Sequence, residues 1–195
     1  MKTSREISLP ARFNNLIFTQ SDSLCKVTLL PERKECRMLR LYITKAKPNP
    51  AGKDRSGGNI SSQQLAGEWV DFQNTGDQPY LLDNVHLQHI AYTAQYPVNG
   101  QWEEACDFSG TLPVGEIVRV HSGGSTPLDQ LRIEDRLGAH HHVFTGKSYI
   151  WNNSRPDTAR LVLEINGQTT ELDKASYSAN PPEGRILVRS GNSLI

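Results

Sequence analysis

The stretch GEWVDFQNTG, residues 67–76, decides the fold, because apolar and polar side chains alternate along it until a turn begins. Val70 and Phe72 fall on one side of such a strand, and Asp71 falls on the other. The same alternation places Trp69 on the polar side, since successive side chains of a strand point to opposite faces. We therefore expect the Trp69 ring to be covered by the protein's own chain or to contact a partner.

Short alternating runs of this kind recur along the chain. The strand-like stretches are LCKVTLL (24–30), MLRLYITKA (38–46), NVHLQHIAY (84–92), EIVRVHS (116–122), ARLVLEINGQTTELDKASY (159–177) and RILVRS (185–190). Asn-Gly pairs at Asn99-Gly100 and Asn166-Gly167 are strong short signals for a hairpin. Short strands at this spacing, with turn residues between them, predict an all-β sandwich or barrel.

Two segments do not follow the strand pattern. The first, KPNPAGKDRSGGNISSQQLAG (47–67), is rich in Pro, Gly, Ser and Asn and has no hydrophobic period, which predicts a long loop. The second, TPLDQLRIEDRLG (126–138), carries Leu and Ile at loosely helical spacing. This spacing predicts at most a short helical turn.

Charge and cysteine content exclude several classes of protein. The chain has 195 residues, with 21 Lys plus Arg and 21 Asp plus Glu, so its formal net charge is zero. General binders of nucleic acid or anionic membranes usually carry a basic excess, so the charge balance disfavours both classes. Three widely spaced cysteines without a CxxC pair indicate neither a zinc ribbon nor a disulfide framework. The sequence shows no apolar leader and no membrane span, and we expect a cytoplasmic protein.

Three segments, in order, resemble the lamin tail domain, an immunoglobulin-like module of nuclear lamins and of many bacterial proteins. They are KPNPAGKD with GEWVDFQNTGDQPYLLDN (within 47–84), FSGTLPVGEIVRVHSGG (108–124) and IWNNSRPDTARLVLEINGQTTELDKASY (150–177). The first segment is similar to the family's Pro-Gly loop and Glu-aromatic-Val strand. The second is similar to its Val-rich strand ending in small residues, and the third to its Trp-Asn-Asn and Asn-Gly hairpin. The stretch NSRPD departs from the family, which often has a Gly before the Asp.

The resemblance implies an immunoglobulin-like β-sandwich of two packed sheets over residues 38–178. An N-terminal extension (1–37) and a C-terminal tail (179–195) find no counterpart. The resemblance also implies a non-catalytic binding or scaffolding module, so we expect no enzymatic activity and no cofactor. Residues 127–142 are longer and more charged than the family's connection, which indicates an insertion specific to this chain.

A protein partner is the expected ligand of such a module, which would act as an adaptor or as a subunit of a larger assembly. Trp69 would anchor the partner if its ring lay on an exposed sheet face, although a structural role is the favoured interpretation. The apolar run RFNNLIFTQ supplies three more candidate contacts, Phe13, Ile17 and Phe18. Homo-oligomerisation through this run, or docking of the run on its own domain, are the alternatives.

Two further hypotheses rest on charged and polar clusters. A nucleic-acid-associated accessory protein, which the net charge disfavours, would use Arg33, Lys34, Arg37, Arg40, Lys53 and Arg55. A metal-dependent hydrolase would be centred on His140 and His142 of GAHHHVF, which share one face of a strand about 7 Å apart by strand rise. A catalytic metal needs a third ligand, for which His86, His121 and Asp135 are candidates by elimination. The simpler interpretation of the three histidines is that they form the polar beginning of a strand, with one of them packed against the protein.

Overall fold

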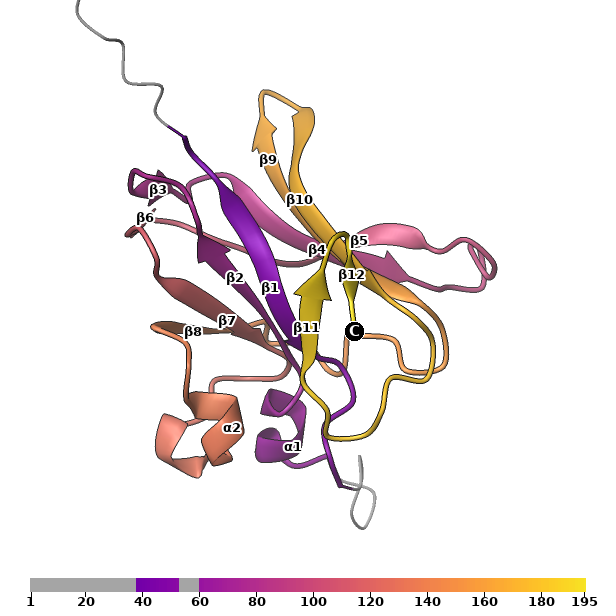
Figure 1. The fold of residues 1–195 in the computed structure, drawn as a ribbon. Helices are drawn as coiled ribbons and strands as arrows, with labels where there is room; N and C mark the ends of the chain where they lie inside the picture. The colour runs from indigo at the N-terminus through magenta and orange to yellow at the C-terminus, as the bar shows by residue number, and fades with distance from the viewer. Residues whose placement is uncertain (1–37, 53–59) are drawn as a thin grey trace, which may run out of the picture. The chain divides into compact units, whose positions relative to one another are not determined.

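The computed structural model describes residues 38–52 and 60–195, and strands dominate these residues (Figure 1). The elements are β1 (Leu41–Lys47), α1 (Ser62–Ala66), β2 (Trp69–Asn74), β3 (Tyr80–Leu81), β4 (Val85–Ala91), β5 (Gln101–Asp107), β6 (Thr111–Leu112), β7 (Ile117–His121), the 3-10 turn η1 (Leu128–Gln130), α2 (Ile133–Arg136), β8 (His141–Phe144), β9 (Asp157–Ile165), β10 (Gln168–Tyr177), β11 (Leu187–Ser190) and β12 (Ser193–Leu194). The described fold is all-β, which confirms the predicted class.

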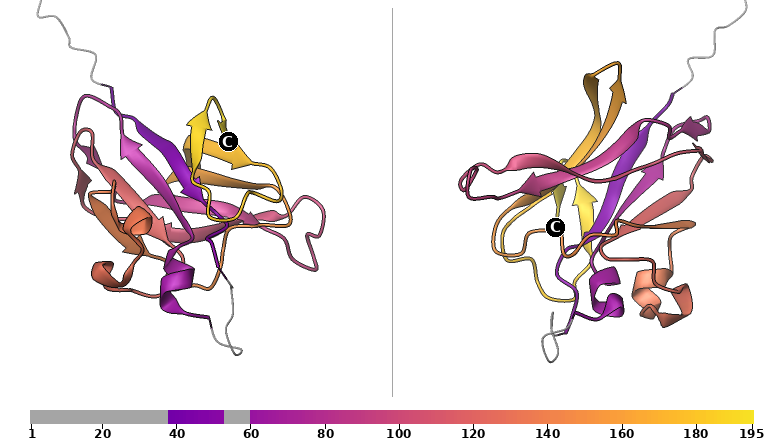
Figure 2. Two further views of the ribbon diagram at one scale, coloured as in Figure 1. Left: turned by 60° about the horizontal axis from the view of Figure 1, so that its bottom comes forward. Right: turned by 180° about the vertical axis from the view of Figure 1, so that it is seen from behind.

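One large sheet contains most of these strands. Its order is β5-β4-β9-β10-β12-β11-β1-β2-β7-β8, and β3 pairs with β6 in a separate small sheet. The large sheet curls, so that a β9 half (β5, β4, β9, β10 and β12) faces a β1 half (β11, β1, β2, β7 and β8) (Figures 1 and 2). β12 runs parallel to β10, and β11 runs antiparallel to both β12 and β1. The two halves are therefore continuous on this side, whereas the sheet stops at β5 and at β8 on the other.

The hydrophobic core lies between the two halves. Val70 and Phe72 are fully buried, as the alternation in β2 predicted, and they share one cluster with Leu87 of β4 and Leu161 of β9. The rings of Phe72 and Phe108 meet edge to face, with their centroids 5.0 Å apart. Burial of each such side chain stabilises a protein by roughly 1.5–3 kcal/mol. Because both halves contribute to this cluster, its burial holds them together.

The two Asn-Gly pairs both lie in hairpins, but only one of them forms the turn. Asn166 and Gly167 connect β9 to β10, with φ of 52° and 76°, as a type I′ turn requires. The pair Asn99-Gly100 lies in a longer connection, residues 92–100, between β4 and β5. Of these two residues Gly100 has a positive φ, 65°. The second pair therefore indicates the hairpin correctly without forming its tight turn.

The C-terminal residues belong to the large sheet. Val188 of β11 pairs with Lys45 of β1, and the side chains of Leu187 and Leu194 are 5% and 3% exposed within the core cluster. The sequence patterns assigned residues 179–195 to a C-terminal tail. These residues instead supply the two strands that connect the halves of the sheet.

Short helical segments lie together at one end of the β1 half (Figure 1). The segment 126–138 forms η1 and α2, in agreement with the predicted short turns. Helix α1 lies in the stretch for which a loop was predicted, and the Ser61 hydroxyl caps it by accepting a hydrogen bond from the Gln64 amide at 3.0 Å. One turn of helix is too short to produce a periodic pattern in the sequence, so only the cap could have indicated it.

Candidate protein-binding surface

Trp69 lies on the outer face of the β1 half and is completely buried beneath α2. Its indole Nε1 donates a hydrogen bond to Asp135 Oδ1 at 2.8 Å, and the guanidinium of Arg119 lies 3.7 Å from its ring centre. Asp135 Oδ1 also accepts a hydrogen bond from Lys47 Nζ at 2.7 Å. The chain itself therefore covers the polar side of β2, and Trp69 offers no surface to a partner. Asp135 of α2 supplies the hydrogen-bond acceptor in this cover.

A second ion pair completes this Trp69 cluster, which consists of Lys47, Trp69, Asp71, Arg119 and Asp135. Arg119 Nε and Nη2 donate to Asp71 Oδ1 and Oδ2 at 2.7 and 2.8 Å, while Nη1 donates to the carbonyls of Glu134 and Leu137. Burial raises the pKa of Asp71, although the Arg119 hydrogen bonds oppose this effect. Both side chains are almost fully buried, so the cluster fastens α2 to the sheet and forms no open site.

The β9 half exposes a different tryptophan. Trp102 of β5 is 41% exposed, and the guanidinium of Arg160 from β9 lies 3.8 Å from its ring centre. Arg160 Nε and Nη2 both donate to Gln88 Oε1, at 3.1 and 2.5 Å, and this holds the guanidinium in place above β4. Tryptophan and arginine are among the residues most enriched at binding hot spots. This pair is therefore suited to anchoring a partner.

The connection between β4 and β5 projects away from the body of the fold (Figures 1 and 2). Tyr96 and Val98 within it are 40% and 78% exposed. Tyr92 lies beneath the guanidinium of Arg155, 4.7 Å from its ring centre, and Arg155 Nη1 donates to the carbonyl of Pro97. We call these side chains together the β5 surface: Tyr92, Tyr96, Val98, Trp102, Arg155 and Arg160.

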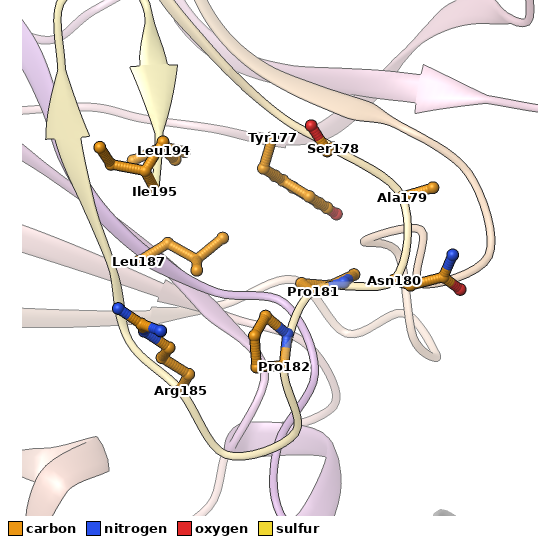
Figure 3. A pocket seen from close by; sticks show the side chains of 10 residues that line it. All are labelled: Tyr177, Ser178, Ala179, Asn180, Pro181, Pro182, Arg185, Leu187, Leu194 and Ile195. Atoms are coloured by element: carbon orange, nitrogen blue, oxygen red, sulfur yellow. The ribbon is translucent and has the colours of Figure 1, made fainter.

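A hollow of about 330 Å³ lies beside the C-terminal strands (Figure 3). Tyr177, Pro181 and Leu187 give it a largely apolar lining, and Arg185 adds a cation. Burial raises the pKa of Tyr177 well above its usual value, and its hydroxyl donates to the carbonyl of Asn152 at 3.0 Å. The phenol therefore has a structural role, and the hollow is better suited to holding an apolar group than to acid–base chemistry.

Two of the histidines that suggested a metal, His121 and His142, lie together, but no third ligand joins them among the described residues. His140 Nδ1 accepts a hydrogen bond from the Ile117 amide at 3.1 Å, and His142 Nδ1 lies 2.8 Å from His121 Nε2. Residues 38–52 and 60–195 contain no group of three or more His, Cys, Asp or Glu side chains that could hold a metal ion. His121 Nδ1 lies 2.6 Å from the carbonyl of Ala66 and must donate to it, because a carbonyl only accepts. His121 Nε2 therefore accepts from His142.

His121 is expected to remain neutral in the folded protein at pH 5, because burial lowers its pKa to about 3. An unfolded histidine has a pKa of about 6.5. Between these two values the unfolded chain binds the extra proton, so the free energy of unfolding falls as the pH decreases. Nitrogen-15 NMR of the imidazole should show the Nδ1-protonated neutral ring at pH 5, and an imidazolium spectrum from folded protein would contradict this assignment.

Other buried titratable groups tie loops to strands. Glu68 Oε2 accepts hydrogen bonds from the Ile150 amide at 3.0 Å and from the Ser122 hydroxyl. Burial raises the pKa of Glu68 to about 8. Burial likewise raises the pKa of Cys106 to about 12, so its thiol is a poor nucleophile.

The remaining predicted site residues are mostly outside the described part of the chain. These are Phe13, Ile17, Phe18, Arg33, Lys34, Arg37, Lys53 and Arg55. Arg40 is exposed, and its guanidinium lies 5.0 Å from the ring centre of Tyr42. The sequence patterns did not single out Trp102 or Arg160. An aromatic residue among the charges of QWEEACD, directly after an Asn-Gly pair, was the available signal.

No family model matches the chain, and no curated protein matches it at a significant level. Within the described residues, no helix is both long and apolar enough to cross a membrane.

Proposed function

We propose that this chain is a non-catalytic protein-interaction module, which acts as an adaptor or as a subunit of a larger assembly. We further propose that its curled sheet is an immunoglobulin-like β-sandwich of the lamin-tail type. The facing halves of the sheet support the sandwich, and so do the places of the family-like motifs. Glu68, Trp69 and Val70 enter β2, Trp151 and Asn152 precede β9, and the Asn166-Gly167 turn joins β9 to β10.

One observation carries the proposal, namely the exposed Trp102 ring stacked with Arg160 on the terminal strand of the sheet. A large aromatic ring left open to solvent beside a positioned arginine is typical of protein-binding surfaces. The nearby exposed side chains Tyr96 and Val98 enlarge the apolar area. The buried side chains of Glu68, Asp71 and His121, in contrast, hydrogen-bond to other groups of the chain.

Replacing Trp102 with Ala is expected to abolish capture of specific proteins from a native lysate by the tagged full chain, because truncation of a hot-spot tryptophan costs about 2 kcal/mol or more of binding energy. Ile133→Ala is the matched control, since Ile133 is 62% exposed but lies in α2. Quantitative mass spectrometry after nuclease treatment should find a protein set that is lost with Trp102→Ala and kept with Ile133→Ala. Equal capture by both variants would contradict the assignment of this surface, and loss of all partners on nuclease treatment would contradict the proposed function.

A further inference from the structure

The two ends of the large sheet border a groove. The sheet stops at β5 and at β8, and a groove of about 430 Å³ is lined by residues from the end of β5 and from β8. Leu82, Phe108, Leu112 and Val118 line it, and each is at most 9% exposed. Val143 of β8 lines the groove as well and packs against the core. Buried side chains of the hydrophobic core therefore form the floor of this groove.

The strands at both sides of the groove are the two terminal strands of the large sheet. Among the described residues, β5 pairs with β4 alone and β8 pairs with β7 alone. On the opposite side of the fold, β11 and β12 fill the corresponding position between the two halves. An unpaired strand edge presents free amides and carbonyls, and an added strand can bind to them.

The charged side chains around the groove are mostly acidic. Asp107 lines the groove beside His141 and His142, and Glu116 Oε2 lies 2.6 Å from His141 Nε2. Glu103 and Glu104 lie in β5, and Asp83 follows Leu82 of the lining. Lys147 is the basic neighbour, with its Nζ 3.8 Å from the Glu103 carboxylate and donating to the backbone carbonyl of Glu104. This imbalance favours a ligand that carries Lys or Arg, because opposite charges across an interface steer and orient binding.

We propose that the groove between β5 and β8 binds an extended, basic segment of a partner protein as an added strand. Apolar side chains of that segment alternate into the floor formed by Phe108, Leu112 and Val118, while its Lys or Arg side chains meet the acidic edge. Binding displaces Lys147 from the Glu104 carbonyl, which the added strand then uses. The inference rests on the proposed interaction function and adds to it a binding place and a ligand chemistry.

Binding of a synthetic peptide to the full chain tests this inference. The probe is a fluorescent peptide of alternating Lys and Val, about nine residues long, which is within the length of an ordinary strand. One control peptide alternates Glu and Val, and another has the composition of the probe with its Lys and Val residues in separate blocks. By fluorescence anisotropy at physiological salt, we expect the probe to bind at least about tenfold more tightly than either control. Equal affinity for all three peptides, or no binding of the probe, would overturn the proposal.

Variants on the groove locate the binding site. Ser109 is exposed at the groove, and Ser109→Trp should block it and weaken probe binding by about tenfold. Lys147→Ala should strengthen binding by about threefold, because it frees the Glu104 carbonyl and increases the negative charge. Circular dichroism confirms that each variant is folded. Unchanged affinity in both variants would place the peptide elsewhere and overturn the proposal.

Two further measurements separate this inference from others. Sedimentation of the wild-type chain and of Ser109→Trp tests for a second copy in the groove, and a dimer that the substitution converts to a monomer would overturn the proposal in favour of self-association. Capture of the protein partners by Ser109→Trp is the other measurement. If Ser109→Trp captures the protein partners normally although it no longer binds the probe, the partners do not use the groove. The interaction function then stands, and only the groove assignment fails.

Discussion

Replacing Asp135 with Asn is expected to lower the free energy of unfolding by about 3 kcal/mol, because the substitution leaves the buried ammonium of Lys47 without its buried counter-charge. The Lys47 and Asp135 side chains are 0% and 1% exposed, and their charged atoms are 2.7 Å apart. Asn keeps an oxygen that can accept from Trp69 Nε1, so the loss reports mainly on the ion pair. Urea denaturation at neutral pH, with unchanged dependence on denaturant, should give this value, and a loss below about 1 kcal/mol would contradict it.

Glu134→Gln is the matched control for this substitution. Glu134 Oε1 lies 3.5 Å from the same Lys47 Nζ, but the Glu134 side chain is 48% exposed. Solvent screens such a pair, so we expect a change within about 0.5 kcal/mol. The double variant Lys47→Met with Asp135→Asn should recover part of the lost stability, because it removes the buried charge together with its partner. No recovery would show that the loss comes from packing.

The sequence predicted the faces of β2 correctly but not what covers them. Alternation alone put Val70 and Phe72 in the core and Trp69 on the opposite side. It could not show that Asp135, far away in the sequence, provides the acceptor for Trp69. The charged residues of a segment such as TPLDQLRIEDRLG do not indicate which strand they will contact, because the contact depends on tertiary packing.

Irregular strand pairing is another feature that an alternating sequence pattern does not predict. The register of β1 against β2 shifts between Ile43 and Lys45, so Ala46 rather than Lys45 returns to the core. A bulge of this kind adds a residue to one strand and reverses the faces beyond it. The contact between Trp102 and Arg160 cannot be predicted from a sequence pattern either. Their strands, β5 and β9, are separated by β4, so the contact depends on the order of strands in the sheet.

Glu68 should make the folded protein less stable as the pH rises toward 8. Burial is the main cause that raises its pKa to about 8; the nearby Asp157 acts in the same direction, whereas hydrogen bonds from Ser122 and from the Ile150 and Trp151 amides oppose the shift. Its Oε1 has no hydrogen-bond partner within the described residues, which adds to the penalty for a negative charge there. The folded protein therefore holds this carboxyl protonated at neutral pH.

The sign of the effect follows from proton uptake. The ordinary pKa of Glu, 4.5, applies to the unfolded chain, so between pH 4.5 and about 8 the folded state holds a proton that the unfolded state has released. The free energy of unfolding must then fall with increasing pH, by up to about 1.4 kcal/mol per pH unit for one proton. This loss begins above pH 4.5 and is complete above about pH 8. His121 acts in the opposite direction below its unfolded pKa, so the two groups together favour a stability maximum in mildly acidic solution.

Glu68→Gln isolates this contribution, because every other titrating group is common to the two proteins. The amide is neutral at all pH values and keeps an oxygen to accept from Ser122 and from the Ile150 amide. We expect the variant to match the wild-type free energy of unfolding within about 1 kcal/mol at pH 5 and to exceed it by about 3 kcal/mol at pH 8.5. Denaturation curves measured across this range test the difference, and two parallel pH profiles would show that Glu68 is ionised in the folded protein.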